Sequence, residues 1–313
     1  MKIVLKLKMY LMKKTSYLIL LFLLTNLGNL FGQEYLTYYE RCNAADEQIY
    51  LKNYAVALEK FELAFKDVSY VHNEQYVKAS KCAILIQRYD KAYTYICQLR
   101  KQGDSNRFLD KKMFKSFKKS DWYQKYKDNV LSYDKIFQAS IHQKYAYLID
   151  SLHYIDQYII RKNKKYKGKY IIPKEKIPEN VWDLDQSNIE ILVKLIQEYG
   201  FPSEQLVGVH RYKQAVVILL HNLRLHPNEK YHEIALNAVK TGEYLPENYL
   251  LMYEQYSNNN GITYYTTWDK DLSAKNLARL ESNRKQIGLK PLKAYSIKNR
   301  GLKMRIKWGI FRR

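Results

Sequence analysis

Apolar side chains recur every three or four residues along most of the chain, which is the spacing of amphipathic helices. One stripe runs from 145 to 159 and another from 189 to 196, and each predicts a helix with one buried face. Between 212 and 220 the chain is apolar almost all round, which predicts a buried central helix. Gly200 and Gly242 stand where two of the predicted helices end. The pattern therefore predicts a mainly helical protein.

Two short segments alternate in the way that is typical of strands. Residues 262–268 are rich in Tyr and Thr, and residues 302–308 alternate apolar with basic side chains. We predict that the two segments pair as a small β-hairpin element. The alternative is that 302–308 lies on a membrane surface with its apolar face inserted. A Lys-rich stretch with two prolines, 161–181, is predicted to be an exposed loop.

The segment from about 35 to 135 contains an internal repeat. Tyr54 and Ala57 correspond to Tyr89 and Ala92 thirty-five residues later. Small side chains stand where two helices would cross, and an aromatic ring fills the gap between them, at Ala45, Ala57, Ala64 and Phe61. This spacing resembles the tetratricopeptide repeat, although Lys52 replaces the usual turn glycine and Leu99 stands at a small-residue position.

The resemblance implies helical hairpins that stack and form a curved surface. On this analogy, five side chains would face the concave side: Tyr39, Asp46, Tyr50, Glu74 and Lys81. One interpretation is a groove that binds a protein or peptide partner. The other is that two or three repeats only brace the domain that follows.

A second set of short motifs lies between 145 and 295. In chain order they are Asp156-Gln157 with Arg161, Gly200-Phe201-Pro202, Val207-Gly208, His221, Glu254-Gln255, Tyr265-Thr266-Thr267-Trp268, Arg284, Gly288-Leu289 and Pro291-Leu292. The set resembles a family of uncharacterised domains found in exported bacterial proteins, often behind tetratricopeptide-like helices. The resemblance implies an architecture and no activity. The family's Gln-His and Asp-Arg pairs are incomplete here, since Leu220 and Glu254-Gln255 replace their members, and this weakens the case for catalysis.

These patterns together predict the fold class and the domains. We expect a mainly α protein in which tetratricopeptide-like helical hairpins pack on a helical domain with a small β-hairpin element. The predicted segments are a signal peptide at 1–32, the repeats at 33–138, a helical domain of unknown function at 139–295 and a basic C-terminal tail at 296–313.

The N-terminus has the three parts of a secretory signal. Lys13 and Lys14 precede an apolar run at 17–24, and Gly32 offers a small residue just before Gln33. Cleavage there would release an exported chain, periplasmic or secreted, with no transmembrane segment. The alternative is an uncleaved N-terminal anchor.

The basic character of the chain is concentrated at its C-terminus. The formal net charge is +22, and residues 282–313 contain eleven basic residues and no acidic one. In an exported protein such a tail is expected to meet an anionic envelope surface and not nucleic acid. The alternative is a solvated tail that only keeps the protein soluble.

Three polar residues in or beside the apolar stripes, Asp156, His221 and Glu254, are candidates for the acid–base site of a hydrolase-like enzyme. Arg284 could hold an anionic group. The alternative is that these side chains are hydrogen-bonded members of the core. His232-Glu233 begins like a zinc-protease helix but lacks the second histidine, and no metal or cofactor is predicted. A non-enzymatic binding or scaffolding role in the envelope is therefore expected.

The cysteines Cys42, Cys82 and Cys97 all fall in helical patterns. Two of them could pair in an oxidising compartment and leave the third free. The simpler expectation is three buried, unreactive thiols.

Overall fold

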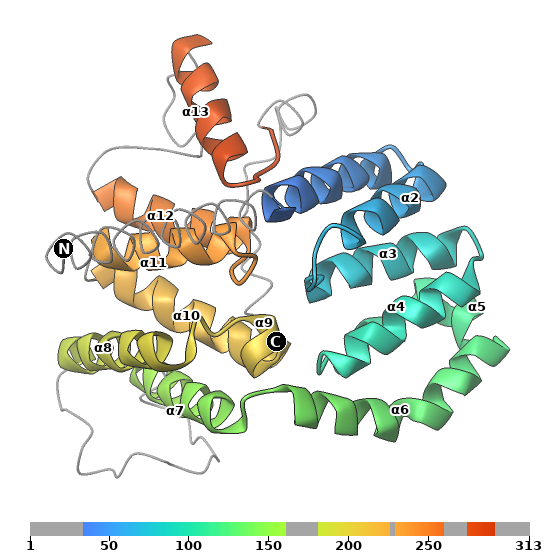
Figure 1. The fold of residues 1–313 in the computed structure, drawn as a ribbon, viewed down its shortest axis with the longest axis horizontal. Coiled ribbons are helices and arrows are strands. Elements are labelled where there is room, and N and C mark those ends of the chain that lie inside the picture. The colour runs from blue at the N-terminus through green and yellow to red at the C-terminus, as the bar shows by residue number, and fades with distance from the viewer. Residues whose placement is uncertain (1–33, 161–180, 226–228, 260–273, 292–313) are drawn as a thin grey trace, which may run out of the picture.

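The computed structural model describes residues 34–160, 181–225, 229–259 and 274–291. Helices dominate these residues and no strand lies among them, which confirms the mainly helical prediction. The helices form two lobes, an N-terminal lobe of residues 34–140 and a C-terminal lobe made of the described residues from 143 onward (Figure 1). The predicted signal peptide, β-hairpin and basic tail, and almost all of the predicted loop at 161–181, lie outside the described residues.

The N-terminal lobe is a stack of helices that follow one another in the chain (Figure 1). Contacts join α2 to α3, α3 to α4 and α4 to α6. The elements are a first helix at 34–50, α2 Tyr54–Phe65, α3 Asn73–Leu85, α4 Tyr89–Lys101, the short 3-10 helices η1 Arg107–Asp110 and η2 Lys112–Phe114, α5 Lys115–Lys118, and α6 Asp121–Ser140.

Small side chains let these helices approach closely, as the sequence predicts. The predicted small and aromatic positions of the first unit are completely buried, namely Ala45, Ala57, Ala64 and Phe61. In the second unit Ala92, Ile96 and Leu99 are buried to the same extent. Methyl groups at these contacts leave room for the larger rings and aliphatic chains that fill the space between helices.

The thirty-five-residue period is also present in the backbone. Lys52 and Gln87 have positive φ, at 63° and 60°, in the turns before α2 and α4. Each turn is closed by a hydrogen bond that spans five residues, from the Asn53 N–H to the Gln48 carbonyl and from the Arg88 N–H to the Ala83 carbonyl. A left-handed backbone conformation at the C-terminus of a helix is normally adopted by glycine, but here Lys52 and Gln87 adopt it. The assignment to the tetratricopeptide family itself stays a prediction.

The C-terminal lobe is built around α10, as its apolar sequence predicts. The elements are α7 Gln143–Ile160, α8 Val181–Tyr199, α9 Glu204–Val207, α10 Val209–Leu225, α11 Glu229–Lys240, α12 Pro246–Asn259 and α13 Ala274–Gln286. Helix α10 contacts α7, α8, α9 and α12. Its buried side chains are Val209, Tyr212, Ala215, Val216, Val217, Ile218, Leu219 and Leu220. The core of the lobe is therefore organised by one helix with apolar residues on nearly every side.

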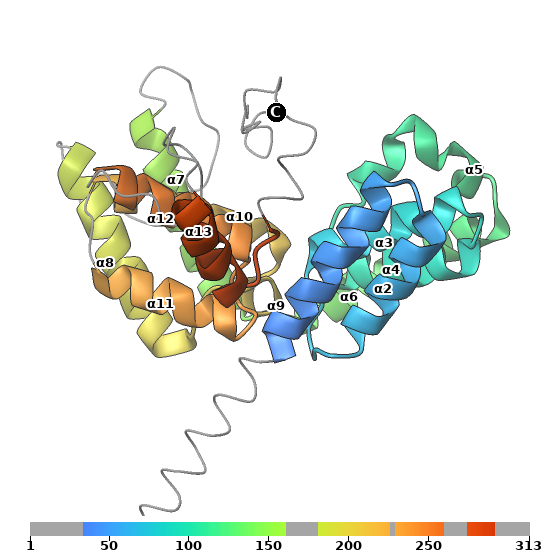
Figure 2. The same ribbon diagram turned by 90° about the horizontal axis from the view of Figure 1, so that it is seen from above.

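The first helix lies at the junction between the lobes (Figure 2), where its aromatic rings contact the C-terminal lobe. The ring of Tyr35 lies against Gly242, and Tyr39 lies against Gly288. A Cβ at either glycine would overlap the ring, and both glycines have positive φ, at 74° and 72°. Because α11 and α13 end in glycine, their ends can approach the first helix this closely.

The three cysteines are buried, and none of them forms a disulfide. Burial raises the pKa of all three thiols, and that of Cys82 rises to about 12. The prediction that the three thiols are buried is therefore confirmed, and that they are unreactive stays a prediction, which the raised pKa values favour. In the part of the chain that the structure describes, no helix has the length and apolarity that crossing a membrane requires.

The two left-handed turns generate a stability prediction. Lys52→Gly and Gln87→Gly are each expected to raise the free energy of unfolding by about 0.5 kcal/mol, because the strain relieved exceeds the entropy that glycine adds to the unfolded chain. The control is Lys66→Gly, at a residue with right-handed helical φ of −81°, which should lower stability by about 0.5–1 kcal/mol. Urea unfolding followed by circular dichroism measures all three. If all three substitutions destabilised the protein equally, the left-handed turns would not be strained positions.

Candidate functional site: the cleft between the lobes

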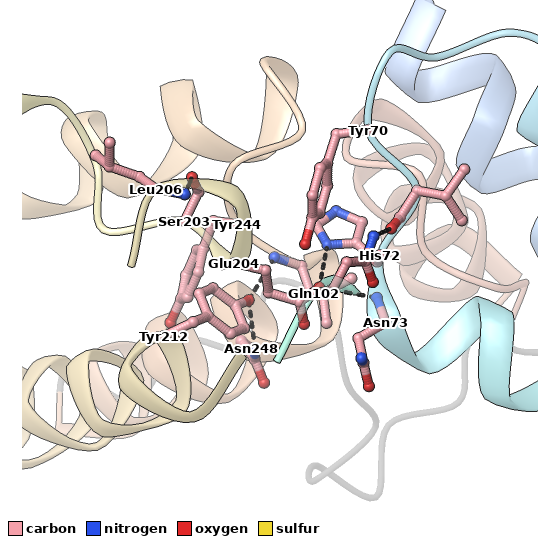
Figure 3. Close-up of polar contacts among 12 residues, drawn as sticks. Tyr70, His72, Asn73, Gln102, Ser203, Glu204, Leu206, Tyr212, Tyr244 and Asn248 are labelled. Carbon is pink, nitrogen blue, oxygen red and sulfur yellow. Dashed lines mark hydrogen bonds and ion pairs between the residues drawn. The ribbon is translucent and has the colours of Figure 1, made fainter. Parts of the chain in front are cut away.

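Glu204 is a nearly fully buried acid at the junction of the lobes, with 4% of its surface exposed. It is the first residue of α9, whose N-cap Ser203 accepts a hydrogen bond from the Leu206 N–H at 3.2 Å. The Leu206 carbonyl in turn accepts the His142 N–H at 2.9 Å, which ties α9 to the start of α7. These bonds fix the direction in which the Glu204 side chain leaves its short helix and enters the junction (Figure 3).

The Glu204 carboxylate caps a helix of the other lobe. Its Oε2 accepts the Asn73 N–H at 2.8 Å, at the point where α3 begins (Figure 3). The N-cap residue of α3 is His72, whose side chain makes no capping bond. The first N–H groups of a helix have no partner within the helix and carry partial positive charge, so a carboxylate is a favourable partner for them.

The remaining polar groups at this contact come from both lobes. The His72 N–H donates to the Tyr38 hydroxyl at 3.1 Å, and His72 Nδ1 lies 3.6 Å from Glu204 Oε2. Burial, with the nearby Glu204 charge as a further cause, raises the pKa of the Tyr38 and Tyr212 hydroxyls. Both tyrosines therefore stay neutral. The Tyr212 hydroxyl accepts from Asn248 Nδ2 at 2.8 Å and from the Leu245 N–H at 3.0 Å.

A cleft of about 620 Å³ opens beside Glu204, between the two lobes. This volume is in the range of ligand-binding pockets. The N-terminal lobe contributes Asn73, Glu74, Val77, Asp104, Ser105, Arg107, Phe108 and Lys111. The C-terminal lobe contributes Glu204, Val209, Tyr212, Lys213, Val216, Leu245 and Asn248. Apolar side chains from both lobes thus face the same space as several polar and charged ones.

Each acidic side chain of the cleft has a partner within the protein. Glu204 accepts from Asn73, Glu74 pairs with Lys78 at 2.8 Å, and Asp104 accepts the Asn106 N–H at 2.6 Å. Arg107, Lys111 and Lys213 are exposed, and no described carboxylate lies within ion-pairing distance of them. The three cations are therefore the charged side chains of the cleft that have no partner of opposite charge or hydrogen-bond acceptor among the described residues.

Of the five residues predicted to face the concave side of the repeats, Tyr39 and Asp46 contact the C-terminal lobe. Tyr39 is buried at the lobe junction, where its hydroxyl donates towards the carbonyls of Val239 and Tyr244 at 3.4 Å, so it does not line an open surface. Asp46 pairs with Lys78 at 2.9 Å and with Lys290 of the C-terminal lobe. The C-terminal lobe therefore covers this part of the predicted groove.

The other three predicted groove residues remain accessible. Tyr50 is 60% exposed at the end of the first helix, away from the cleft lining. Glu74 lines the cleft. Lys81 is half-buried, and burial, followed by the positive charges of Lys111 and Lys78, lowers the pKa of its amine. Glu74 and Lys81 thus lie at the open part of the predicted groove.

The structure brings two of the three predicted catalytic residues together. His221 Nδ1 lies 2.9 and 3.0 Å from the two oxygens of Asp156, which is 1% exposed. Gln157 Nε2 donates to the same carboxylate at 2.8 Å. The His221 side chain is 35% exposed, so part of the ring reaches solvent. Glu254 belongs to α12, but its side chain is outside the described part of the structure.

Arg284 is buried in the last turn of α13. The residue is only 5% exposed, and its Nε donates to the Lys290 carbonyl at 2.6 Å. Arg284 thus ties the chain that follows α13 to the helix, and its predicted anion-binding role stays a prediction. Among the described residues, no cluster of His, Cys, Asp and Glu could hold a metal ion.

Comparison with known proteins gives no match: no family model, no curated protein and no solved structure is significantly similar to the chain. The two family resemblances therefore stay predictions, and the site has to be argued from its own geometry.

The residues that matter most at the cleft were not predicted from the sequence. Glu204, Asn73 and Arg107 lie in no motif, and they meet only when the lobes pack together. One local signal existed for Glu204. The sequence before α3 offers His72 as N-cap, and a helix without a capping side chain needs an acceptor from elsewhere.

The capping contact generates a stability prediction. Glu204→Leu keeps most of the side-chain volume but leaves the buried Asn73 N–H without an acceptor, so it should lower the free energy of unfolding by about 2 kcal/mol. Glu204→Gln keeps an acceptor oxygen and should lose less than half as much. The exposed Glu233→Leu is the control and should stay within about 0.5 kcal/mol. A Glu204→Leu variant as stable as the unchanged protein in chemical denaturation would refute the capping role.

Proposed function

We propose that this protein is exported to the bacterial cell envelope and binds a partner protein there, in the cleft between its lobes. The observation that carries the proposal is the cleft itself, which both lobes line with apolar and polar side chains. The N-terminal leader supports export, and the basic tail at 296–313 would contact an anionic envelope surface. In this view the helical repeats both brace the C-terminal lobe and form one wall of the site.

Two features support binding of a polypeptide in particular. Val77 and Phe108 of the N-terminal lobe and Val216 and Leu245 of the C-terminal lobe line the cleft, which suits apolar side chains of a partner. Asn73 and Asn248 lie on opposite sides of the space beside Glu204 (Figure 3). A side-chain amide carries one donor group and one acceptor, as a peptide group does, so the two asparagines suit main-chain recognition.

Cross-linking in cells tests the proposal. A photoreactive amino acid at Val77, inside the cleft, is expected to form an adduct with one partner protein, which mass spectrometry of the cross-linked peptide identifies. The same group at the exposed Tyr147, outside the cleft lining, is the control and should not form that adduct. The mature protein recovered from the envelope fraction should begin at Gln33. Identical adducts from both positions, or an intact leader on a cytosolic protein, would refute the proposal.

A hydrolase-like enzyme is the second candidate, and the contact between Asp156 and His221 favours it. A carboxylate that binds Nδ1 orients the imidazole and stabilises its protonated form, which is the arrangement of a general acid–base pair. If this is the function, Asp156→Asn and His221→Ala should each lower hydrolysis of a panel of ester and amide substrates at least a hundredfold without unfolding the protein. Unchanged rates in both variants would exclude this site.

A further inference from the structure

We propose that the segment bound in the cleft is acidic, with carboxylate groups that contact Arg107, Lys111 and Lys213 and apolar side chains that pack between the two walls. This inference rests on the proposed function, and it assigns the class of partner.

The acidic side chains of the cleft have partners within the protein, but its exposed basic side chains do not have a carboxylate partner among the described residues. Its acids accept hydrogen bonds or pair with lysine within the N-terminal lobe or across the junction. Its three exposed cations, two on the N-terminal lobe and one on α10, have no carboxylate partner in the described ranges. Because they come from both lobes, an anionic segment between them would be attracted by both walls at once.

Lys81 adds to the same positive region. Burial lowers the pKa of its amine, and the charge of Lys111 lowers it further. Like charges that lower one another's pKa repel, and an anion bound in the cleft beside Lys111 would reduce that repulsion. A basic or neutral segment would leave the repulsion in place.

The uncharged polar groups favour a peptide over a simple anion. Asn73 is buried at the cleft wall, and its amide nitrogen has no hydrogen-bond partner among the described residues. On the opposite wall, Asn248 uses its amide nitrogen on Tyr212, which leaves its oxygen as an acceptor (Figure 3). One wall thus offers a donor and the other an acceptor, and a peptide group needs both.

Three labelled peptides test the inference by fluorescence anisotropy with the mature chain. They share the same alternating Leu and Phe residues and carry Glu, Gln or Lys at the positions between them. The Glu peptide is expected to bind about tenfold more tightly than the Gln peptide, because three exposed ion pairs together contribute about that factor. The Lys peptide should bind most weakly, and added salt should weaken only the preference for Glu.

Charge reversal in the protein provides the matched comparison. The double variant Lys111→Glu with Lys213→Glu, one substitution in each lobe, should abolish the preference for Glu and favour the Lys peptide. The control is Lys135→Glu with Lys240→Glu, which are exposed lysines, one in each lobe, outside the cleft lining. The control should bind the Glu peptide as the unchanged protein does. Thermal unfolding confirms that both double variants are folded.

The binding measurements distinguish failure of the acidic class from failure of the proposed partner-binding function. Phe108→Ala removes an apolar contact and should weaken the Glu and Gln peptides alike. If Phe108→Ala weakens binding but the Glu and Gln peptides bind equally well, the acidic class is overturned and a peptide-binding cleft remains. If none of the three peptides binds, the acidic class is overturned too, and cross-linking from Val77 decides the proposed function independently.

Discussion

The buried carboxylate of Glu204 is the contact between the two lobes on which the cleft depends. Burying an ionised carboxyl group is costly unless strong hydrogen bonds compensate for the lost water. Glu204 meets that condition by accepting the N–H at the start of α3, a group that would itself be buried without a partner. Each lobe thus satisfies a polar group of the other. The contact also fixes the position of α3 and α10 on either side of the cleft, because both helices adjoin the residues that form it.

Tyrosine rings extend the junction away from this contact. Tyr35 and Tyr39 lie against glycines that end α11 and α13, and Asn43 donates to the Gly288 carbonyl at 2.8 Å. The first helix is thereby held along the C-terminal lobe. On the side of Arg107 and Lys213 the lobes separate, and the cleft occupies the space between them. The lobes are therefore in close contact on one side of the junction and leave the cleft open on the other.

Much of the fold was predictable from local pattern. The stripe at 145–159 and the apolar run at 212–220 became α7 and the buried α10, because helical periodicity needs no knowledge of the rest of the chain. Asp156 and His221 were both predicted as candidate site residues, but the sequence did not predict that their side chains are in contact. Tyr39 shows the limit of the repeat analogy, which assigns a helix face but does not say that another lobe covers it. The cleft could not be predicted, since Asn73 and Glu204 are 131 residues apart and lie in no shared motif.

The most direct measurement is the distance between the lobes with and without the Glu204 carboxylate. Spin labels on Leu131→Cys in α6 and Glu233→Cys in α11 report that distance, and the buried native thiols do not compete for the label. The account predicts one narrow distance distribution in the otherwise unchanged protein. It predicts a broadened distribution, with longer distances, when Glu204→Leu is added. An identical narrow distribution in the folded Glu204→Leu protein would contradict the claim that this carboxylate holds the lobes and shapes the cleft.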